Sequence, residues 1–302
     1  MSAKQDTSNA MMMCCASCGA AEGDDVKLKE CDGCDLVTYC SDACKEDHRP
    51  EHEAKCKERA AKKLRHEILF RQPESTHLGD CPICCVPLPM DYDKSILYSC
   101  CSKYICSGCT HANRRRQHRE NMQFTCPLCR QPAPATDEEF DKNLMKRVAA
   151  NDPVALIKFG QKARDKGDYD GAIKYFTKAA ELGDVEAYNE LYMMYRDHVE
   201  NETKEIYYLE EAAIRGHPYA RHNLGNYAWK NDRWGRAIKH WIINANLGFD
   251  KSIETLKQVY KAGYVSKKDF AAALRAHHAA VNAMKSPDRE AAAMFEASGG
   301  NV

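Results

Sequence analysis

Several features are missing from this sequence, and each absence argues against one class of protein. The 44 basic and 44 acidic residues leave a formal net charge of zero, so no overall field favours nucleic acid or an anionic membrane. No uninterrupted apolar run approaches the roughly 18 residues of a membrane span. Residues 1–13 lack the apolar stretch of a signal peptide, and we expect them to form a disordered tail.

Cysteine is absent from residues 130–302, although the chain contains 17 cysteines. All of them lie between Cys14 and Cys129. The odd count, the repeated C-x2-C spacing and the missing signal peptide argue against a disulfide framework and for zinc sites. This cysteine usage predicts a reducing compartment, either cytoplasmic or nuclear.

The first cysteine group has the composition of two tetrahedral zinc sites. Its candidate ligands are Cys15, Cys18, Cys31, Cys34, Cys40, Cys44, His52 and Cys56. Ser41 is a suitable N-cap that would place Cys44 in a first helical turn. Pro50 is expected to open a second helix with His52 and Cys56 on one face, because residues four apart lie on the same side of a helix. Spacing alone does not distinguish interleaved from sequential pairing.

Two other residues compete for these positions. Cys14 is an alternative to Cys15 as the first ligand, and His48 is a rival to His52. Only His52 has the three-residue gap to Cys56.

The ligand order, with the pairs Cys18-Gly19 and Tyr39-Cys40, resembles the MYND zinc finger over residues 15–56. The resemblance implies a non-catalytic module that binds proline-containing peptides or packs inside a larger protein. Where the family usually has Gln and Trp, this chain has Lys45 and Arg49. The resemblance also implies interleaved sites: Cys15, Cys18, Cys40 and Cys44 on one zinc, and Cys31, Cys34, His52 and Cys56 on the other.

A helix is predicted over Glu58–Gln72, ending before Pro73, as a linker to a second cysteine group. The candidate ligands of that group are Cys81, Cys84, Cys100, Cys101, Cys106, Cys109, Cys126 and Cys129. The pattern resembles an all-cysteine RING finger over residues 81–130. The resemblance implies interleaved sites: Cys81, Cys84, Cys106 and Cys109 on one zinc, and Cys100, Cys101, Cys126 and Cys129 on the other.

The adjacent pair Cys100 and Cys101 departs from the commoner RING spacing. Either both bind the same zinc, or that site has three protein ligands or is lost. Cys14 and Cys85 remain as spare thiols. With both fingers complete, the cofactor is Zn²⁺, with four ions and two in each finger.

A RING finger contributes no nucleophile and no general base, so no catalytic residue is assigned. The family docks a ubiquitin-conjugating enzyme and holds the ubiquitin thioester in a reactive pose. The matching partner-binding residues here are Ile83, Pro127, Leu128 and Arg130. The resemblance thus implies a ubiquitin-protein ligase, the alternative being a non-catalytic scaffold in which Ile83 and Leu128 only pack the zinc loops.

Arginines at 114, 115, 116 and 119 follow Cys109 and form a basic segment. They suit phosphate binding, or they form a solvated helix face. The neutral overall charge favours the second interpretation, so neither nucleic acid nor a membrane is an expected partner.

A repeat with a period near 33 residues follows the cysteines. Gly183, Gly216 and Gly248 each close a similar segment, and a fourth copy without glycine begins at Ala149. The pattern predicts two antiparallel helices per unit, with glycine ending the second helix and small alanines letting helices approach. It resembles Sel1-like and tetratricopeptide repeats, which bind proteins. Six aromatic side chains in the repeats are expected to be mainly core residues: Tyr188, Tyr192, Tyr195, Trp229, Trp234 and Trp241.

The predicted fold class is two small zinc-stabilised α+β modules followed by an all-α solenoid of Sel1-like helix pairs. The predicted boundaries are a tail at 1–13, a MYND-type finger at 14–56, a helical linker at 57–77, a RING-type finger at 78–134, repeats at 135–285 and a partly frayed C-terminal tail at 286–302.

Overall fold

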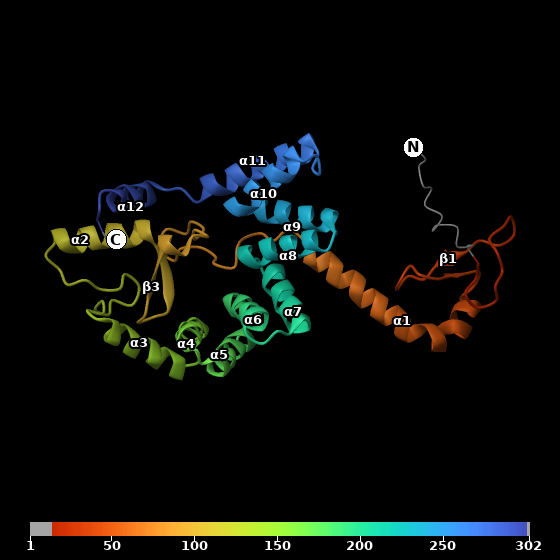
Figure 1. The fold of residues 1–302 in the computed structure, drawn as a ribbon, viewed down its shortest axis with the longest axis horizontal. Helices are drawn as coiled ribbons and strands as arrows, with labels where there is room; N and C mark the ends of the chain where they lie inside the picture. Colours follow the sequence, from red (N-terminus) through yellow and green to blue (C-terminus); the bar gives the residue numbers. More distant parts are fainter. Residues whose placement is uncertain (1–13, 301–302) are drawn as a thin grey trace. The chain divides into compact units, whose positions relative to one another are not determined.

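A computed structural model describes residues 14–300, so the tail expected at residues 1–13 lies outside the described residues. The chain divides into two compact units, one ending at Leu69 and the other beginning at Phe70 (Figure 1). Within residues 14–300, no helix has both the length and the apolar composition that a membrane crossing requires.

The first unit consists of a short hairpin and one long helix. Strands β1 (Lys29–Glu30) and β2 (Thr38–Tyr39) pair antiparallel, and helix α1 (Asp42–Leu69) follows. The buried core of the finger consists of three cysteines and one tyrosine: Cys15, Cys31, Cys34 and Tyr39. A core with so little apolar surface needs a metal to hold it together.

Helix α1 begins as predicted, because the backbone N–H of Cys44 donates to Ser41 Oγ at 3.2 Å. The prediction that Pro50 opens a separate helix is wrong, since α1 is continuous from Asp42 to Leu69 with Pro50 inside it. Proline removes one backbone hydrogen bond from a helix interior. The ligand Cys44 before Pro50 and the ligand His52 after it fix both parts of the helix to the same finger, which outweighs that loss.

The second unit opens with the second cysteine-rich module. It contains a 3₁₀ turn, η1 (Tyr92–Lys94), then strands β3 (Ser95–Tyr98) and β4 (Lys103–Cys106), and helix α2 (Ser107–Arg119). The strands pair antiparallel, with Ile96 opposite Ile105. Ile105 and Cys106 are fully buried in the core of this module.

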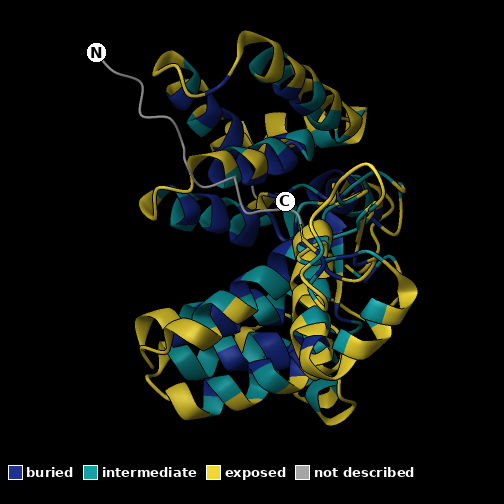
Figure 2. Cartoon of the chain, turned by 90° about the vertical axis from the view of Figure 1, so that its right-hand side faces the viewer, coloured by how far each residue is buried: buried dark blue, intermediate teal, exposed yellow. Residues whose placement is uncertain are grey.

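Nine consecutive helices between residues 137 and 283 form the helical array. They are α3 (Asp137–Ala149), α4 (Pro153–Asp165), α5 (Tyr169–Glu181), α6 (Val185–Asp197), α7 (Glu202–Ile214), α8 (Pro218–Lys230), α9 (Trp234–Asn246), α10 (Asp250–Lys261) and α11 (Lys267–Ala283). Neighbouring helices pack against one another along the array. Their buried residues form stripes along the faces that meet neighbouring helices (Figure 2).

The repeat glycines end the second helix of each pair, as the sequence predicts. Gly183, Gly216 and Gly248 follow α5, α7 and α9 with φ of 87°, 86° and 91°. In the copy without glycine, Asn151 takes the left-handed conformation with φ 56°, and asparagine tolerates that conformation better than most residues. Of the six aromatic residues expected in the core, Trp241 is 2% exposed whereas Trp234 is 44% exposed.

The frayed tail expected at the C-terminus is instead a helix, α12 (Pro287–Ala297). Ser286 caps it, accepting from the backbone N–H of Arg289 at 3.3 Å. Helix α12 packs on α2 so closely that a Cβ on Gly108 would lie 2.6 Å from the backbone nitrogen of Arg289. The partner that stabilises α12 lies about 180 residues earlier in the chain, since Gly108 and Arg289 are 181 positions apart, and local composition does not reveal it.

Candidate metal centres

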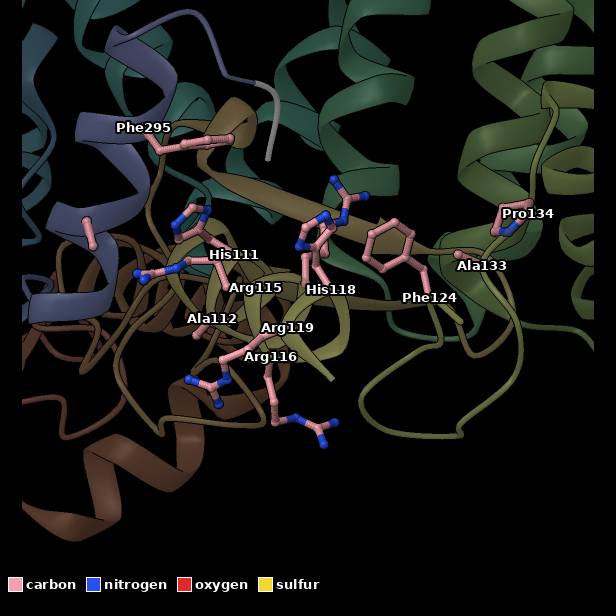
Figure 3. A pocket seen from close by; sticks show the side chains of 12 residues that line it. His111, Ala112, Arg115, Arg116, His118, Arg119, Phe124, Ala133, Pro134 and Phe295 are labelled. Carbon is pink, nitrogen blue, oxygen red and sulfur yellow. The ribbon is translucent and has the colours of Figure 1, made fainter. Parts of the chain in front are cut away.

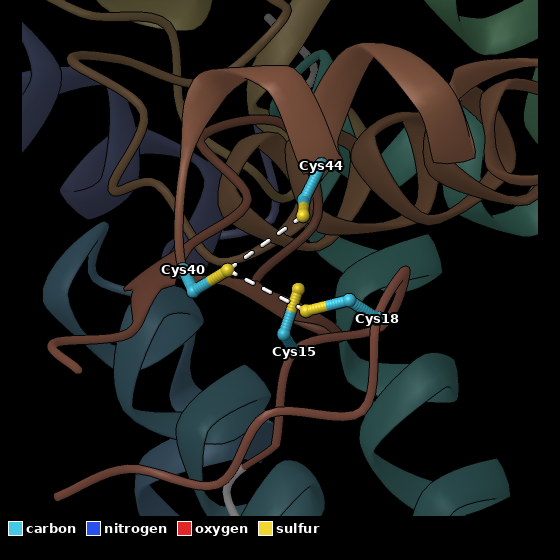
Figure 4. Close-up of side chains that lie close together, drawn as sticks. All are labelled: Cys15, Cys18, Cys40 and Cys44. Atoms are coloured by element: carbon cyan, nitrogen blue, oxygen red, sulfur yellow. Dashed lines mark hydrogen bonds between the residues drawn. The ribbon is translucent and has the colours of Figure 1, made fainter.

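The first centre gathers four cysteines from three segments of the finger (Figure 4). Cys15 and Cys18 come from the first loop, Cys40 follows β2, and Cys44 lies in the first turn of α1. Cys40 Sγ lies 3.6 Å from Cys18 Sγ and 3.6 Å from Cys44 Sγ. Tetrahedral Zn–S bonds of about 2.3 Å would separate sulfurs by about 3.8 Å, so the spacing fits zinc. Cys14 is exposed and outside the group.

The second centre consists of Cys31, Cys34, His52 and Cys56. Cys31 Sγ lies 3.6 Å from Cys56 Sγ, and Cys34 Sγ lies 3.3 Å from His52 Nε2. His48 is not in the group, because its Nδ1 hydrogen-bonds the Tyr39 hydroxyl at 3.0 Å. The two groups therefore follow the interleaved order.

The second module forms two further groups of four sulfurs. Cys84 Sγ lies 3.9 Å from Cys106 Sγ in one, and Cys101 Sγ lies 3.8 Å from Cys126 Sγ in the other. Their members are Cys81, Cys84, Cys106 and Cys109, and Cys100, Cys101, Cys126 and Cys129. The adjacent cysteines thus face the same site, and thiolate sets of this kind suit Zn²⁺.

One backbone turn recurs after four of the five C-x2-C pairs; the exception is Cys106 and Cys109, where helix α2 begins. The residue that follows the pair is left-handed: Gly19 (φ 76°), Asp35 (φ 54°), Cys85 (φ 54°) and Arg130 (φ 60°). Its N–H donates to the carbonyl oxygen of the first cysteine of the pair at 2.9–3.1 Å. Cys85 is therefore the turn residue of its loop rather than a ligand. Of the four turn residues, only Gly19 is a glycine, the residue type that indicates a left-handed turn in a sequence.

The thiols of the first centre do not ionise equally. A hydrogen bond from the backbone N–H of Cys18 is the main reason that the pKa of Cys15 is lowered to about 6. Hydrogen bonding to the sulfurs of Cys18 and Cys44 raises the pKa of Cys40 to about 12. A divalent cation would stabilise the thiolate form of all four, because metal binding displaces thiol protons.

Similar opposing effects act in the second module. Burial acts to raise the pKa of Cys81, but the backbone N–H groups of Cys84 and Cys106 outweigh it and lower the pKa to about 7. Burial raises the pKa of Cys101 to about 11.

Arg289 of α12 supports the first loop of the second module, a contact that sequence reasoning missed. Its guanidinium donates to the carbonyl oxygens of Pro87 at 2.8 Å, Val86 at 3.1 Å and Met284 at 2.7 Å. Nη2 also lies 3.9 Å from Cys84 Sγ. The positive charge of Arg289 offsets part of the negative charge of a four-thiolate centre.

A fifth group of possible ligands lies in the second unit, formed by His77, Glu186 and His217. Glu186 Oε2 lies 3.1 Å from His217 Nε2 and 3.3 Å from His77 Nε2, and it accepts from the Tyr92 hydroxyl. The backbone N–H of Ala220 donates to His217 Nδ1 at 3.1 Å. Neutral His217 therefore carries its proton on Nε2 and donates to Glu186, so Nε2 has no lone pair for a metal. The group is a hydrogen-bonded network.

The four residues expected to bind a partner lie on the loops of the second module. Ile83 and Leu128 are exposed, Pro127 is half-buried, and Arg130 is exposed. Ile83 lies between two ligands of one centre, and Leu128 lies between two ligands of the other.

A family model of the MYND finger matches residues 15–56, the span of the first eight ligands. The first unit therefore contains a MYND-type zinc finger, a kind of module that binds other proteins. A search of curated proteins returns no match to the chain.

Proposed function

We propose that the chain is a RING-type ubiquitin-protein ligase. In this proposal the second cysteine-rich module positions a ubiquitin-conjugating enzyme, while the MYND finger and the helical array, as Sel1-like repeats, recruit the substrate. Catalysis is by orientation of the reactants, so the module needs no nucleophile of its own. Four zinc ions hold the two fingers, and the protein works in the cytoplasm or the nucleus.

The exposure of two apolar side chains supports this proposal most directly. Ile83 is 42% exposed and Leu128 is 37% exposed. Side chains that served only to pack the zinc loops would be buried. Exposed apolar residues on rigid loops are suited to contact a partner.

The first test measures autoubiquitination by the full chain with a panel of conjugating enzymes. We expect Ile83→Ala and Leu128→Ala each to lower the rate by about tenfold or more, because interface anchors are costly to truncate. Leu182→Ala is the matched control, because Leu182 is a 49% exposed leucine on the helical array. Zinc content and thermal unfolding should match the parent in all three variants.

Arg130 needs a different substitution, because its φ is 60°. Alanine at that position would strain the turn by about 1–2 kcal/mol and confuse loss of charge with loss of fold. Arg130→Gly removes the charge and keeps the turn, whereas Arg130→Lys keeps the charge. The proposal expects activity to fall with glycine and to be partly retained with lysine.

A non-catalytic scaffold is the second candidate function. The match to a MYND finger at residues 15–56 and the array of helices α3–α11 both favour it, because such modules bind proteins without chemistry. If no conjugating enzyme of the panel binds the chain or discharges its ubiquitin, the ligase proposal is wrong and the scaffold is the better description.

A further inference from the structure

An open pocket of about 1220 Å³ lies beside α2 in the second unit. Three parts of the chain line it: helix α2, the loop between α2 and α3, and helix α12. Small-molecule sites usually have volumes of about 300–1,000 Å³. This pocket is larger and open, which suits a segment of polypeptide.

Basic side chains form the floor of the pocket. His111, Arg115 and Arg119 follow one another at i, i+4 spacing along α2, so they lie on one side of the helix. Glu120 lies 3.3 Å from Arg116 and 3.8 Å from Arg119. Between residues 14 and 300, Arg115 has no ion-pair partner, so its charge is available to a ligand.

Apolar side chains stand on both sides of this floor. Figure 3 shows Phe295 of α12 on one side of the basic residues and Phe124 with Pro134 on the other. The two phenylalanines are 46% exposed at Phe124 and 41% exposed at Phe295. The ring of Phe295 lies 4.8 Å from that of His111. Apolar side chains bound against these walls would shield the two rings from water.

Acidic residues are close in sequence to the lining residues, but none of them lines the pocket. Helix α3 begins with Asp137, Glu138 and Glu139 just beyond Pro134, and α12 carries Glu290 and Glu296. The basic floor from His111 to Arg119 covers eight residue steps of α2 and is therefore about 12 Å long. A longer polyanion such as single-stranded RNA would extend beyond this short basic floor, whereas a short acidic segment fits within it.

We propose that this pocket binds a short acidic peptide segment of a partner protein. Carboxylates of the peptide pair with Arg115 and Arg119, and apolar side chains of the peptide lie against Phe124 and Phe295. This binding needs no ubiquitin transfer, so it stands or falls separately from the ligase proposal.

The test measures binding of a fluorescent peptide to the full chain. The peptide has about 12 residues, which in helical form are about 18 Å long and cover the whole floor. Glutamates flank a central Phe-Leu pair in this peptide. We expect saturable binding that weakens as salt is raised, because exposed charges are screened. The double variant Arg115→Glu/Arg119→Glu should bind about tenfold or more weakly, and so should Phe124→Ser.

Arg275→Glu is the matched control, because Arg275 is an exposed arginine on helix α11. It should bind the peptide as the parent does. Thermal unfolding and zinc content of every variant show that the fold is intact, and Phe124→Ser provides an uncharged variant if the double reversal fails to fold.

Three results would overturn the proposal. One is equal binding of a peptide in which glutamine replaces each glutamate. Another is tighter binding of a 12-nucleotide oligouridylate than of the acidic peptide, which would identify a nucleic-acid site. The third is unchanged peptide binding by the folded variants with reversed charge or with Phe124→Ser.

Discussion

Two cysteines, Cys85 and Cys14, have no place among the ligands, and their backbone conformations differ. Cys85 has φ 54° and donates its N–H to the Cys81 carbonyl oxygen at 2.9 Å. Cys14 is exposed and pairs with Ala21 in an isolated β-bridge. The two spare thiols thus have opposite backbone requirements, although both are exposed cysteines in zinc modules.

This contrast gives the first prediction. Cys85→Val should destabilise the second module by about 1–2 kcal/mol or more, because a β-branched residue is strained at positive φ. Cys14→Val should be nearly neutral, because valine suits extended backbone. Urea unfolding of the zinc-loaded chain measures both. Cys85→Gly should be as stable as the parent, and an equal loss in the two valine variants would contradict the turn argument.

Arg289 gives a second prediction at the residue scale. Its guanidinium joins α12 to the carbonyl oxygens of Val86 and Pro87, next to the ligand Cys84. Arg289→Met should lower the free energy of unfolding of the second unit by about 2–4 kcal/mol, because hydrogen bonds to a charged group are each worth about 1.5–3 kcal/mol. It should also speed zinc release to a chelator from the second module.

Two control variants are needed. One separates the hydrogen bonds of the Arg289 guanidinium from its charge, and the other tests the loss of an arginine elsewhere on the surface. Arg289→Lys keeps the charge but cannot reach several carbonyl oxygens together, so it should recover only part of the loss. Arg275→Met, at an exposed arginine of α11, should change neither stability nor zinc release. Zinc release at the parent rate from Arg289→Met would show that the guanidinium does not support the centre.

At the scale of helices and strands, the sequence predicts the features that depend on residues close together in the chain, such as the ends of helices. The spacing of Gly183, Gly216 and Gly248 marks the ends of α5, α7 and α9, because a helix that ends in a left-handed residue favours glycine there. The course of α1 through Pro50 and the packing of α12 depend on contacts with distant residues. Neither local propensity nor spacing contains those contacts.

The hydrogen-bonded network around Glu186 connects elements that are far apart in the sequence, and the sequence analysis did not predict this network. His77 precedes the second module, Tyr92 opens η1, and Glu186 and His217 lie at the starts of α6 and α8. Burial lowers the pKa of His217, so the imidazole is neutral in the fold. Partial burial acts to raise the pKa of Glu186, but hydrogen bonds from His217 and His77 outweigh it and hold the pKa well below its usual range.

The third prediction is a pH dependence of stability. Below about pH 6.5 His217 is protonated in the unfolded chain but stays neutral in the folded chain. The unfolded state therefore binds more protons, and the free energy of unfolding decreases as the pH is lowered. His217→Gln keeps a donor to Glu186 but cannot titrate. Between pH 7 and 5 its free energy of unfolding should fall less steeply than that of the parent, by up to about 1.4 kcal/mol per pH unit.

Zinc loss at low pH affects the parent and the variant alike, so the difference between their slopes is the quantity to measure. His278→Gln is the control, because His278 is exposed on α11 and should leave the slope unchanged. Equal slopes for the parent and His217→Gln would show that His217 does not hold a depressed pKa. Glu186 acts in the same direction, but only below about pH 4.5.

At the scale of the whole molecule, spacing predicted the candidate ligands, whereas the family resemblances predicted how these ligands divide among the four centres. Zinc geometry is strict enough that C-x2-C pairs and an i, i+4 pair identify their residues. The residues around the centres are not so constrained. Arg289 is remote in sequence, and the left-handed turns at Asp35, Cys85 and Arg130 are formed by residues with no glycine to announce them.

The units of this protein also have two different kinds of core. In the first, three cysteines and Tyr39 provide the buried residues. In the helical array, the core is alanine, leucine and aromatic side chains such as Phe176, which is fully buried, with no cysteine among residues 130–302. Metal should therefore determine the folding of the fingers and contribute little within α4–α9.

The fourth prediction follows from this difference. A strong chelator should remove about four zinc ions and unfold the fingers, while far-ultraviolet circular dichroism retains most of its helical signal and a cooperative thermal transition. Phe176→Ala should lower the free energy of unfolding of the array by about 3–5 kcal/mol, because it leaves a cavity there. It should leave the zinc content unchanged. Loss of the whole helical signal on chelation would show that the array depends on the fingers, since a solenoid whose helices bury their own apolar faces needs no metal to stay folded.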